Sequence, residues 1–165
     1  MVVPRSEANG LTTPAITGGT GAGYSIAPIE SIVKIRYLRS GCAEGIAASK
    51  RALLVAEDCA TNQVQGTVQI ILDQPENQPH RADIAKMLVH RRARRQGLAA
   101  ALMRAAETTA RAAGKTLLVL DTATGSDAER LYQRMGWNRV GIIPGYALWP
   151  DGRPCATTYY YKSLA

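Results

Sequence analysis

A short basic segment, residues 94–99 with the sequence RRQGLA, has the residue types that could hold a phosphate group. An apolar run, Ile84 to Val89, precedes it, and an alanine-rich segment with helical spacing follows it. The first backbone N–H groups of a helix lack partners within the helix and lie at the positive end of its dipole. A strand that turns sharply into a helix here therefore predicts a pyrophosphate site. The alternative is an ordinary strand-to-helix turn with a basic surface.

The apolar pattern from residue 50 onward predicts the elements that position this corner. The elements expected, in order, are strands at residues 52–56, 65–72 and 81–89, a helix at 98–113, a strand at 117–120, a helix from Ser126 to Gly136, and strands at 137–143 and 157–162. Residues 144–156 are expected to form a long turn. Because a strand, a helix and a strand follow one another around the corner, those two strands should be parallel. The order predicts an α/β (α+β) domain with a mixed sheet.

The two expected helices carry their own signals. In the first, the apolar face is expected at Leu98, Leu102, Ala105, Thr109 and Ala112. The second begins with the Ser-x-x-Glu pattern of a capping box, in which Ser126 and Glu129 satisfy backbone donors reciprocally.

The first fifty residues differ from the rest. Residues 1–28 are rich in Gly, Thr and Pro and poor in charge, which predicts a flexible or atypical tail ahead of a single domain at residues 29–165. Residues 29–40 have helical spacing, although residues 33–38 also alternate as a strand would. We expect a helix at residues 29–40 and a short helical turn near residues 43–49.

Charge and cysteine content narrow the function classes. The 165-residue chain has a formal net charge of +7, with four arginines between Arg91 and Arg95. Such a cluster favours an anionic ligand or a nucleic-acid backbone, and a solvated face is the alternative. Cys42, Cys59 and Cys155 form no zinc-binding spacing with the two histidines, so we expect free thiols in a reducing cytoplasm and no metal. No apolar run long enough to cross a membrane and no signal-peptide pattern occurs.

Two motifs together resemble the GNAT superfamily of N-acetyltransferases. The corner fits that family's acyl-CoA pyrophosphate motif, Arg/Gln-x-x-Gly-x-Gly/Ala, and residues 131–137 (LYQRMGW) resemble its Leu-Tyr-x-x-x-Gly-Phe helix end. The likeness covers roughly residues 52–164. The segments that also resemble the tabtoxin-resistance acetyltransferase branch are residues 81–87, 120–122, 144–146 and 150–153. The resemblance implies the GNAT acyl-CoA N-acyltransferase fold, a mixed sheet of six to seven strands flanked by helices.

The same resemblance implies acetyl-CoA as the acyl donor. The turn would hold its pyrophosphate, the arginines would meet its 3′-phosphate, and the edge of the preceding strand would pair with the pantetheine arm. A bulge in that strand would open the slot. Where many members have an asparagine that contacts the pantetheine, this chain has Gly125 beside Ser126. The cofactor-binding residues expected are Met87, Leu88, Val89, Arg94, Arg95, Gln96, Gly97, Leu98, Ala99 and Ser126. This chain has little that matches the family's first strand and first two helices.

Acyl transfer to an amine requires a neutral amine, donors for the developing oxyanion, and a proton for the departing thiolate. Family analogy places Tyr132 at the thiolate and a backbone N–H near Leu88 at the oxyanion. Asp83 and Asp121, on neighbouring parallel strands near the slot, could bind a cationic amine and take its proton through water.

Each catalytic candidate also has a structural interpretation. Tyr132 could be a half-buried helix residue, Asp121 could cap the following loop, and Asp83 could form a salt bridge with Arg81 or Lys86. The aromatic residues expected to wall the acceptor site are Tyr146 and Trp149.

The resemblance therefore implies an N-acetyltransferase that moves acetyl to a primary amine of a small, amino-acid-like or antibiotic- or toxin-like acceptor by direct attack. The alternatives are a catalytically inactive acyl-CoA sensor, a transferase acting on a protein amine, and a nucleic-acid binder. We expect a cytoplasmic monomer or homodimer that uses no metal and binds neither nucleic acid nor membrane.

Overall fold

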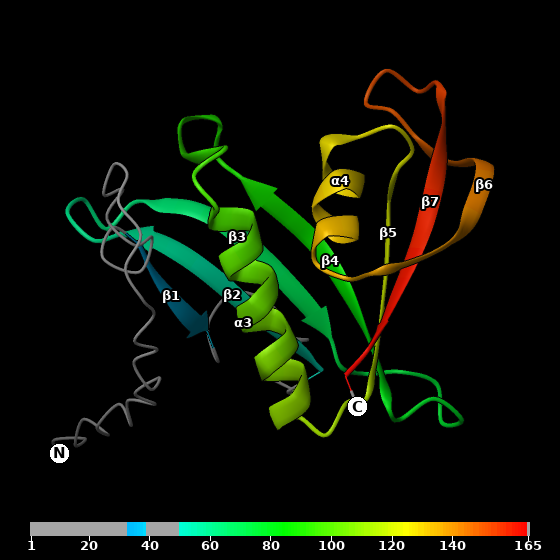
Figure 1. The fold of residues 1–165 in the computed structure, drawn as a ribbon, viewed down its shortest axis with the longest axis horizontal. Helices are drawn as coiled ribbons and strands as arrows, with labels where there is room; N and C mark the ends of the chain where they lie inside the picture. Colours follow the sequence, from blue (N-terminus) through cyan, green and yellow to red (C-terminus); the bar gives the residue numbers. More distant parts are fainter. Residues whose placement is uncertain (1–32, 39–49, 165) are drawn as a thin grey trace, which may run out of the picture.

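The computed structural model describes residues 33–38 and 50–164, which form a seven-stranded mixed sheet with helices packed against it (Figure 1). The elements are β1 (Val33–Leu38), β2 (Arg51–Asp58), β3 (Val64–Ile71), β4 (Arg81–Val89), the 3-10 helix η1 (Arg91–Ala93), α3 (Leu98–Ala112), β5 (Leu117–Ala123), α4 (Asp127–Arg134), β6 (Asn138–Leu148) and β7 (Pro154–Ser163). From residue 50 onward, their order confirms the predicted succession of strands and helices.

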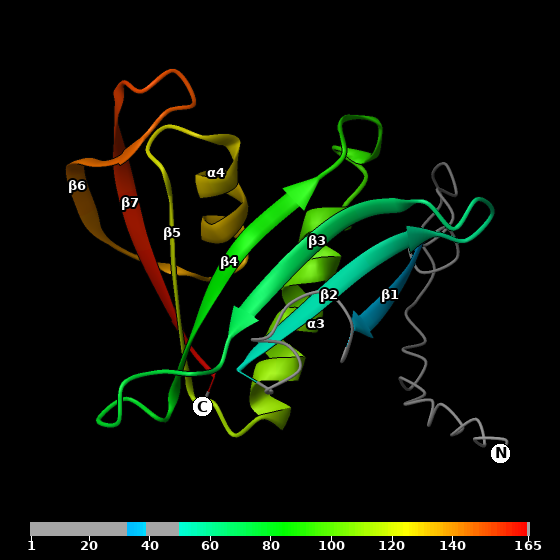
Figure 2. The same cartoon turned by 180° about the vertical axis from the view of Figure 1, so that it is seen from behind.

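The strands lie in the order β1-β2-β3-β4-β5-β7-β6. Within this sheet β4 and β5 are parallel, and the other neighbouring pairs are antiparallel. The parallel pair is the one on either side of α3, as the strand-helix-strand pattern predicts. Figures 1 and 2 show α3 and α4 on the same face of the sheet, with α4 close to β5.

β4 separates from β5 halfway along its length. The parallel pairing runs from Arg81 opposite Leu117 to Ile84 opposite Leu120, and then stops. Beyond it, β4 contains one extra residue relative to β3, and Lys86 adopts a left-handed conformation with φ 52°. A bulge of this kind bends and twists its strand. The expected bulge is therefore present, and it opens a gap between the two central strands.

The core lies between α3 and strands β2, β3 and β4. The residues that α3 buries are Leu98, Leu102, Met103, Ala106, Glu107 and Ala110. The predicted apolar face is right for Leu98 and Leu102, and Ala105 packs against the core partly buried, but Thr109 is only half-buried and Ala112 is exposed. At Gly66 on β3, an added Cβ would lie 2.9 Å from Leu102 Cδ1 and 3.0 Å from the Leu88 carbonyl oxygen. Glycine therefore lets α3 approach the sheet beside the bulge.

The predicted helix at residues 29–40 is wrong over Val33–Leu38, which forms the edge strand β1. This segment pairs antiparallel with β2. Val33 is buried, whereas Lys34 and Arg36 are exposed and contact Glu57 of β2 across the strands. The alternation of apolar and basic residues, supported by these cross-strand ion pairs, prevails over the helical spacing. The predicted tail at residues 1–28 and the turn near residues 43–49 lie outside the described residues.

The predicted long turn at residues 144–156 is also wrong for most of its length. β6 continues to Leu148 and β7 begins at Pro154. The β6–β7 pairing has an irregularity between Ile143 and Ala147, where Gly145 has φ 63°. Since β6 lies at the edge of the sheet, it accommodates Pro144 without losing a ladder hydrogen bond to a second neighbour.

Candidate functional site

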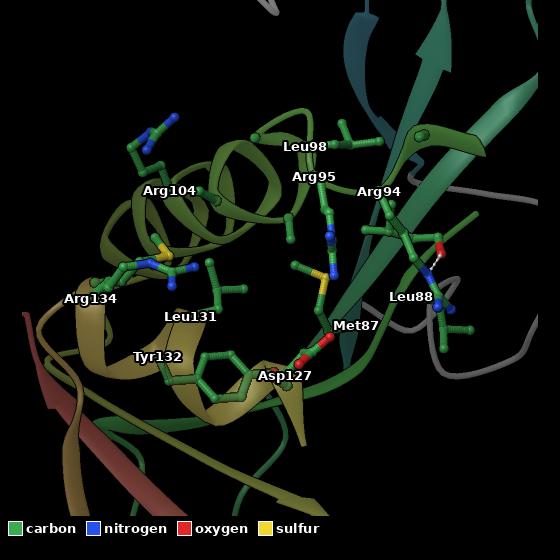
Figure 3. A pocket seen from close by; sticks show the side chains of 17 residues that line it. Met87, Leu88, Arg94, Arg95, Leu98, Arg104, Asp127, Leu131, Tyr132 and Arg134 are labelled. Atoms are coloured by element: carbon green, nitrogen blue, oxygen red, sulfur yellow. Dashed lines mark hydrogen bonds between the residues drawn. The ribbon is translucent and has the colours of Figure 1, made fainter. Parts of the chain in front are cut away.

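A cleft of about 570 Å³ lies between α3, α4 and the bulged end of β4 (Figure 3). The predicted cofactor-binding residues that line it are Met87, Leu88, Val89, Arg94, Arg95, Gly97, Leu98 and Ala99. The lining is completed by Tyr132 and by residues that were not among the predicted cofactor contacts, namely Ala93, Ala100, Arg104, Asp127, Ala128, Leu131, Arg134 and Met135. The corner and the tyrosine helix therefore form two walls of one site.

The corner has the geometry of an anion-binding turn. Gly97 is the N-cap of α3 and has φ 83°, and Arg95 is also left-handed with φ 61°. Because glycine has no side chain, the N-cap offers no acceptor to the backbone N–H groups in the first turn of α3. The N–H groups at this helix end therefore remain available for an anionic ligand at the positive end of the helix dipole.

Two predicted cofactor contacts lie outside the cleft lining. The Gln96 side chain donates from Nε2 to the Arg92 carbonyl oxygen at 3.0 Å, which braces the loop before α3. The Ser126 hydroxyl lies 3.3 Å from the Thr122 hydroxyl. Ser126 is the N-cap of α4 but forms no side-chain cap, and its own backbone N–H donates to the Ala123 carbonyl oxygen, so the predicted capping box does not form. Glu129 instead accepts a hydrogen bond from the backbone N–H of Gly125, one residue before the N-cap, at 2.8 Å.

Four arginines give the cleft a strongly positive lining. Arg94 and Arg95 come from the corner, Arg104 from α3 and Arg134 from α4 (Figure 3). The Arg94 side chain also donates from Nε to the Val89 carbonyl oxygen at 3.3 Å. A cleft lined by one sign of charge concentrates a ligand of the opposite sign. This lining favours a ligand with several phosphate groups.

Tyr132 lies on α4 between the cleft and the core. The side chain is 4% exposed, and its ring packs against Trp137 and Tyr160 with centroid separations of 6.0 and 5.8 Å. Its hydroxyl has no hydrogen-bond partner among the described residues. Burial, with a smaller contribution from the negative charge of Asp121, raises the pKa of Tyr132 to about 12. The phenol is therefore protonated at neutral pH and can donate a hydrogen bond into the cleft.

Asp83 is engaged by neighbours on the face of the sheet away from the helices. Its carboxylate forms an ion pair with Arg81 and accepts a hydrogen bond from Gln74 Nε2 at 3.2 Å. The Arg81 guanidinium also contacts the Gln74 side-chain oxygen and Gln78. The salt-bridge interpretation of Asp83 is therefore present in the structure.

Asp121 differs from Asp83 in its partners, although burial is the main cause of the raised pKa of Tyr159 and both carboxylates add to it. Asp121 is the first residue of β5 beyond the last pair with β4, and it lies opposite Tyr159 of β7. Within the described ranges, its carboxylate forms no ion pair or hydrogen bond. Its charge raises the pKa of Tyr132, and it also contributes to the raised pKa of Tyr159, for which burial is the largest cause. Asp121 therefore lies within electrostatic reach of tyrosines on α4 and on β7.

The two predicted acceptor residues lie on the β6–β7 hairpin. Tyr146 is exposed, and its ring meets the ring of Tyr159 edge to face with centroids 5.4 Å apart. Trp149 is exposed at the turn between β6 and β7. Tyr146 thus contacts Tyr159, the residue opposite Asp121, whereas the Trp149 side chain forms no hydrogen bond or ring contact with these residues in the described part of the chain.

The sequence did not indicate two kinds of residue that the structure places at the site, the arginines of the helices and Tyr159. Arg104 and Arg134 line the cleft because of how α3 and α4 are rotated about their axes. Tyr159 depends on the β5–β7 register, for which the sequence offers no local signal. Among the described residues, no group of three or more His, Cys, Asp or Glu side chains could hold a metal ion. No described helix is long and apolar enough to span a membrane.

Comparisons with known proteins agree with this geometry. Residues 32–137 match the family model described as Acetyltransferase (GNAT) family. A GNAT acetyltransferase structure from Streptococcus pneumoniae is 25% identical, with a TM-score of 0.61, and the match covers 69% of this chain and 67% of that one. A candidate acetyltransferase from Salmonella typhimurium, solved with its cofactor acetyl-CoA, is 20% identical, with a TM-score of 0.65 and coverage of 74% and 69%.

A ribosomal-protein-alanine N-acetyltransferase from Brucella melitensis is 22% identical, with a TM-score of 0.64 and coverage of 73% of each chain. The family match begins at residue 32 and so includes β1, ahead of the region whose likeness was apparent from the motifs. Since the family model covers well over half of the chain, and the described sheet and helices have the corresponding fold, this chain belongs to the GNAT family of acetyltransferases.

Proposed function

We propose that this protein transfers an acetyl group from acetyl-CoA to a primary amine by direct attack, without a covalent enzyme intermediate. The observation that carries the proposal is the cleft itself. It brings together the uncapped N-terminus of α3, which begins after Gly97 in a left-handed conformation, a lining of arginines, and a gap between β4 and β5. These features suit the pyrophosphate, the remaining phosphate and the extended arm of a CoA thioester, respectively.

Each part of the cleft would bind a different part of acetyl-CoA. The α3 N-terminus would bind the pyrophosphate, and the bulged strand at Met87, Leu88 and Val89 would hold the pantetheine arm by its backbone. The N–H near Leu88 would donate to the oxygen of the reacting carbonyl. Tyr132, protonated and buried beside the gap, would donate to the leaving sulfur.

Asp121 is our candidate for the acceptor side, in preference to Asp83. An unpaired carboxylate can hold an ammonium group and take its proton, directly or through water, whereas the Asp83 carboxylate is already neutralised by Arg81. Tyr159 lies opposite Asp121 in the ladder, and its ring contacts that of Tyr146, which adds an aromatic surface that favours cations. The arrangement supports a small, positively charged amine as the acceptor. The tabtoxin-resistance branch remains a prediction from the motifs.

A direct test is to incubate the full chain with acetyl-CoA and a panel of amines that contains diamines, amino acids, aminoglycosides and peptides with free amino termini. Because Cys59 is an exposed thiol, released CoA should be quantified by chromatography instead of a thiol reagent. We expect CoA release with cationic small amines, and a loss of about 10²-fold or more in kcat for Tyr132→Phe.

The panel also separates the rival functions. Release with peptides alone would favour a protein amine as the acceptor, as the name of the Brucella structure says of that protein. Binding of acetyl-CoA with no release from any acceptor would favour an acyl-CoA sensor.

A further inference from the structure

A partly buried ion pair joins the far half of α3 to β7, and the side chain of its lysine, Lys162, is 21% exposed. Glu107 of α3 is 6% exposed, and Lys162 Nζ lies 2.8 and 2.9 Å from its two carboxylate oxygens. Removing a carboxylate and part of an ammonium group from water costs hydration, so such a pair often stabilises a fold no more than two apolar side chains of similar volume would. Its presence therefore calls for a reason beyond stability.

Lys162 makes a third contact that suggests the reason. Its Nζ also donates to the Met135 carbonyl oxygen at 2.8 Å, and Met135 is the C-cap of α4. The last carbonyl groups of a helix have no partner within the helix and lie at the negative end of its dipole. One ammonium group thus binds the end of α4 and is held in turn by α3.

The helix held in this way is short and carries one wall of the cleft. α4 has 8 residues, about two turns, which cannot form a stable helix without tertiary contacts. From its second half, Leu131, Tyr132, Arg134 and the C-cap Met135 line the cleft opposite α3 (Figure 3). A displacement of this end of α4 would move the cleft wall and Tyr132 together.

We propose that Lys162, held by Glu107, is a positioning residue for the acyl-donor cleft, because it fixes the end of α4 relative to α3. The proposal rests on the proposed function in one respect, since acetyl-CoA is the probe for the cleft. The ion pair lies behind the cleft wall, as neither Lys162 nor Glu107 is part of the lining. Its effect is therefore on the placement of Tyr132 and its neighbours.

The chain offers a matched control for Lys162→Met. Lys115 donates from Nζ to the Leu72 and Pro79 carbonyl oxygens at 2.9 and 2.8 Å, and it does not line the cleft. A misplacement of about 1 Å can cost about 10²-fold in reactivity. We expect Lys162→Met to weaken acetyl-CoA binding, measured by calorimetry, by about tenfold or more, and Lys115→Met to leave it within about twofold.

A double variant separates positioning from stability. Glu107→Leu with Lys162→Met removes both charges, so its melting temperature should recover most of the loss caused by Lys162→Met alone. The Met135 carbonyl still lacks its partner, so affinity for acetyl-CoA should stay low. If affinity recovers along with the melting temperature, or if Lys162→Met binds as the wild type does, the ion pair only stabilises the fold and the proposal is wrong.

Amide hydrogen exchange provides a second readout that needs neither the double variant nor a ligand. The Gly136 and Trp137 N–H groups donate to the Gln133 and Tyr132 carbonyl oxygens at the end of α4. Lys162→Met should accelerate exchange at these two amides, and Lys115→Met should not. Unchanged exchange there would overturn the proposal. Failure of the wild-type protein to bind acetyl-CoA would instead count against the proposed function, with the exchange result unaffected.

Discussion

Asp121 lies directly opposite Tyr159 in the β5–β7 ladder, one residue beyond the point where β4 leaves β5. The carboxylate therefore sits where the sheet divides, between the tyrosine of the cleft and the aromatic pair on the hairpin. Of the two aspartates that the sequence nominates, Asp121 is unpaired among the described residues, whereas Asp83 is bound to Arg81.

The first prediction compares these two aspartates. Asp121→Asn should lower kcat/KM for the amine by about 10²-fold or more, because the amide can neither balance an ammonium charge nor take its proton. Asp83→Asn should lower it by less than about tenfold, with the main effect on stability through the unpaired Arg81. Steady-state rates and acetyl-CoA affinity should be measured for both, and affinity should change in neither. Equal losses of rate would reject the distinction between them.

The second prediction concerns stability at high pH. The Tyr132 phenol has its pKa raised to about 12 by burial, so the folded state keeps a proton that the unfolded chain releases near pH 10. The stabilisation that this phenol gives the folded state is complete below about pH 10. It is lost as the pH rises toward 12, when the free energy of unfolding falls by up to about 1.4 kcal/mol per pH unit.

Urea unfolding between pH 9 and 11.5 measures this slope. Tyr159 and Tyr160, whose pKa values are also raised chiefly by burial, add to it in the same direction. Tyr132→Phe should therefore flatten the decline without abolishing it. A slope identical to that of the wild type would mean that the Tyr132 phenol is not buried as described.

The sequence predicts the parts of this site that are local and leaves out those that depend on tertiary packing. The corner at residues 94–99 and the strands beside it follow from apolar runs, a glycine and a helical repeat. The sequence predicts a helix where β1 lies because a segment of six residues is too short for its periodicity to distinguish a helix from a strand. Pairing with β2, which the local sequence does not encode, stabilises the strand.

Side-chain placement was harder to predict than the elements. Glu107 is buried because α3 rotates by part of a turn relative to the face expected from Ala105 and Thr109. Its partner Lys162 is 55 residues away in the sequence. Likewise, Asp83 and Asp121 were equivalent candidates until the ion pair with Arg81 distinguished them.

The third prediction tests the close packing beneath the bulge. In Gly66→Ala the new methyl group would press on Leu102 and on the Leu88 carbonyl, which should cost about 1–3 kcal/mol of stability and displace the bulged strand. We expect a higher KM for acetyl-CoA as well. Gly141→Ala on β6 is the control, since nothing lies within 4 Å of its added Cβ. The same change in both variants would show that the packing at Gly66 does not shape the cleft.

The fourth prediction concerns the left-handed turn. Ala at position 97 would strain the backbone by roughly 1–2 kcal/mol and place a methyl group beside the helix N-terminus. Gly97→Ala should therefore weaken acetyl-CoA binding by about tenfold or more. Gly114→Ala, at the other end of α3 with φ 74°, should cost similar stability without loss of affinity. Equal effects of the two variants on affinity would place the pyrophosphate elsewhere.

The most direct test of the proposed donor site is a calorimetric titration of acetyl-CoA into the full wild-type chain. We predict binding of one acetyl-CoA per chain, competed by CoA, with an affinity that falls as salt screens the four arginines of the cleft. The absence of saturable binding at millimolar acetyl-CoA, or binding that Gly97→Ala leaves unchanged, would contradict an acyl-CoA site between α3 and α4.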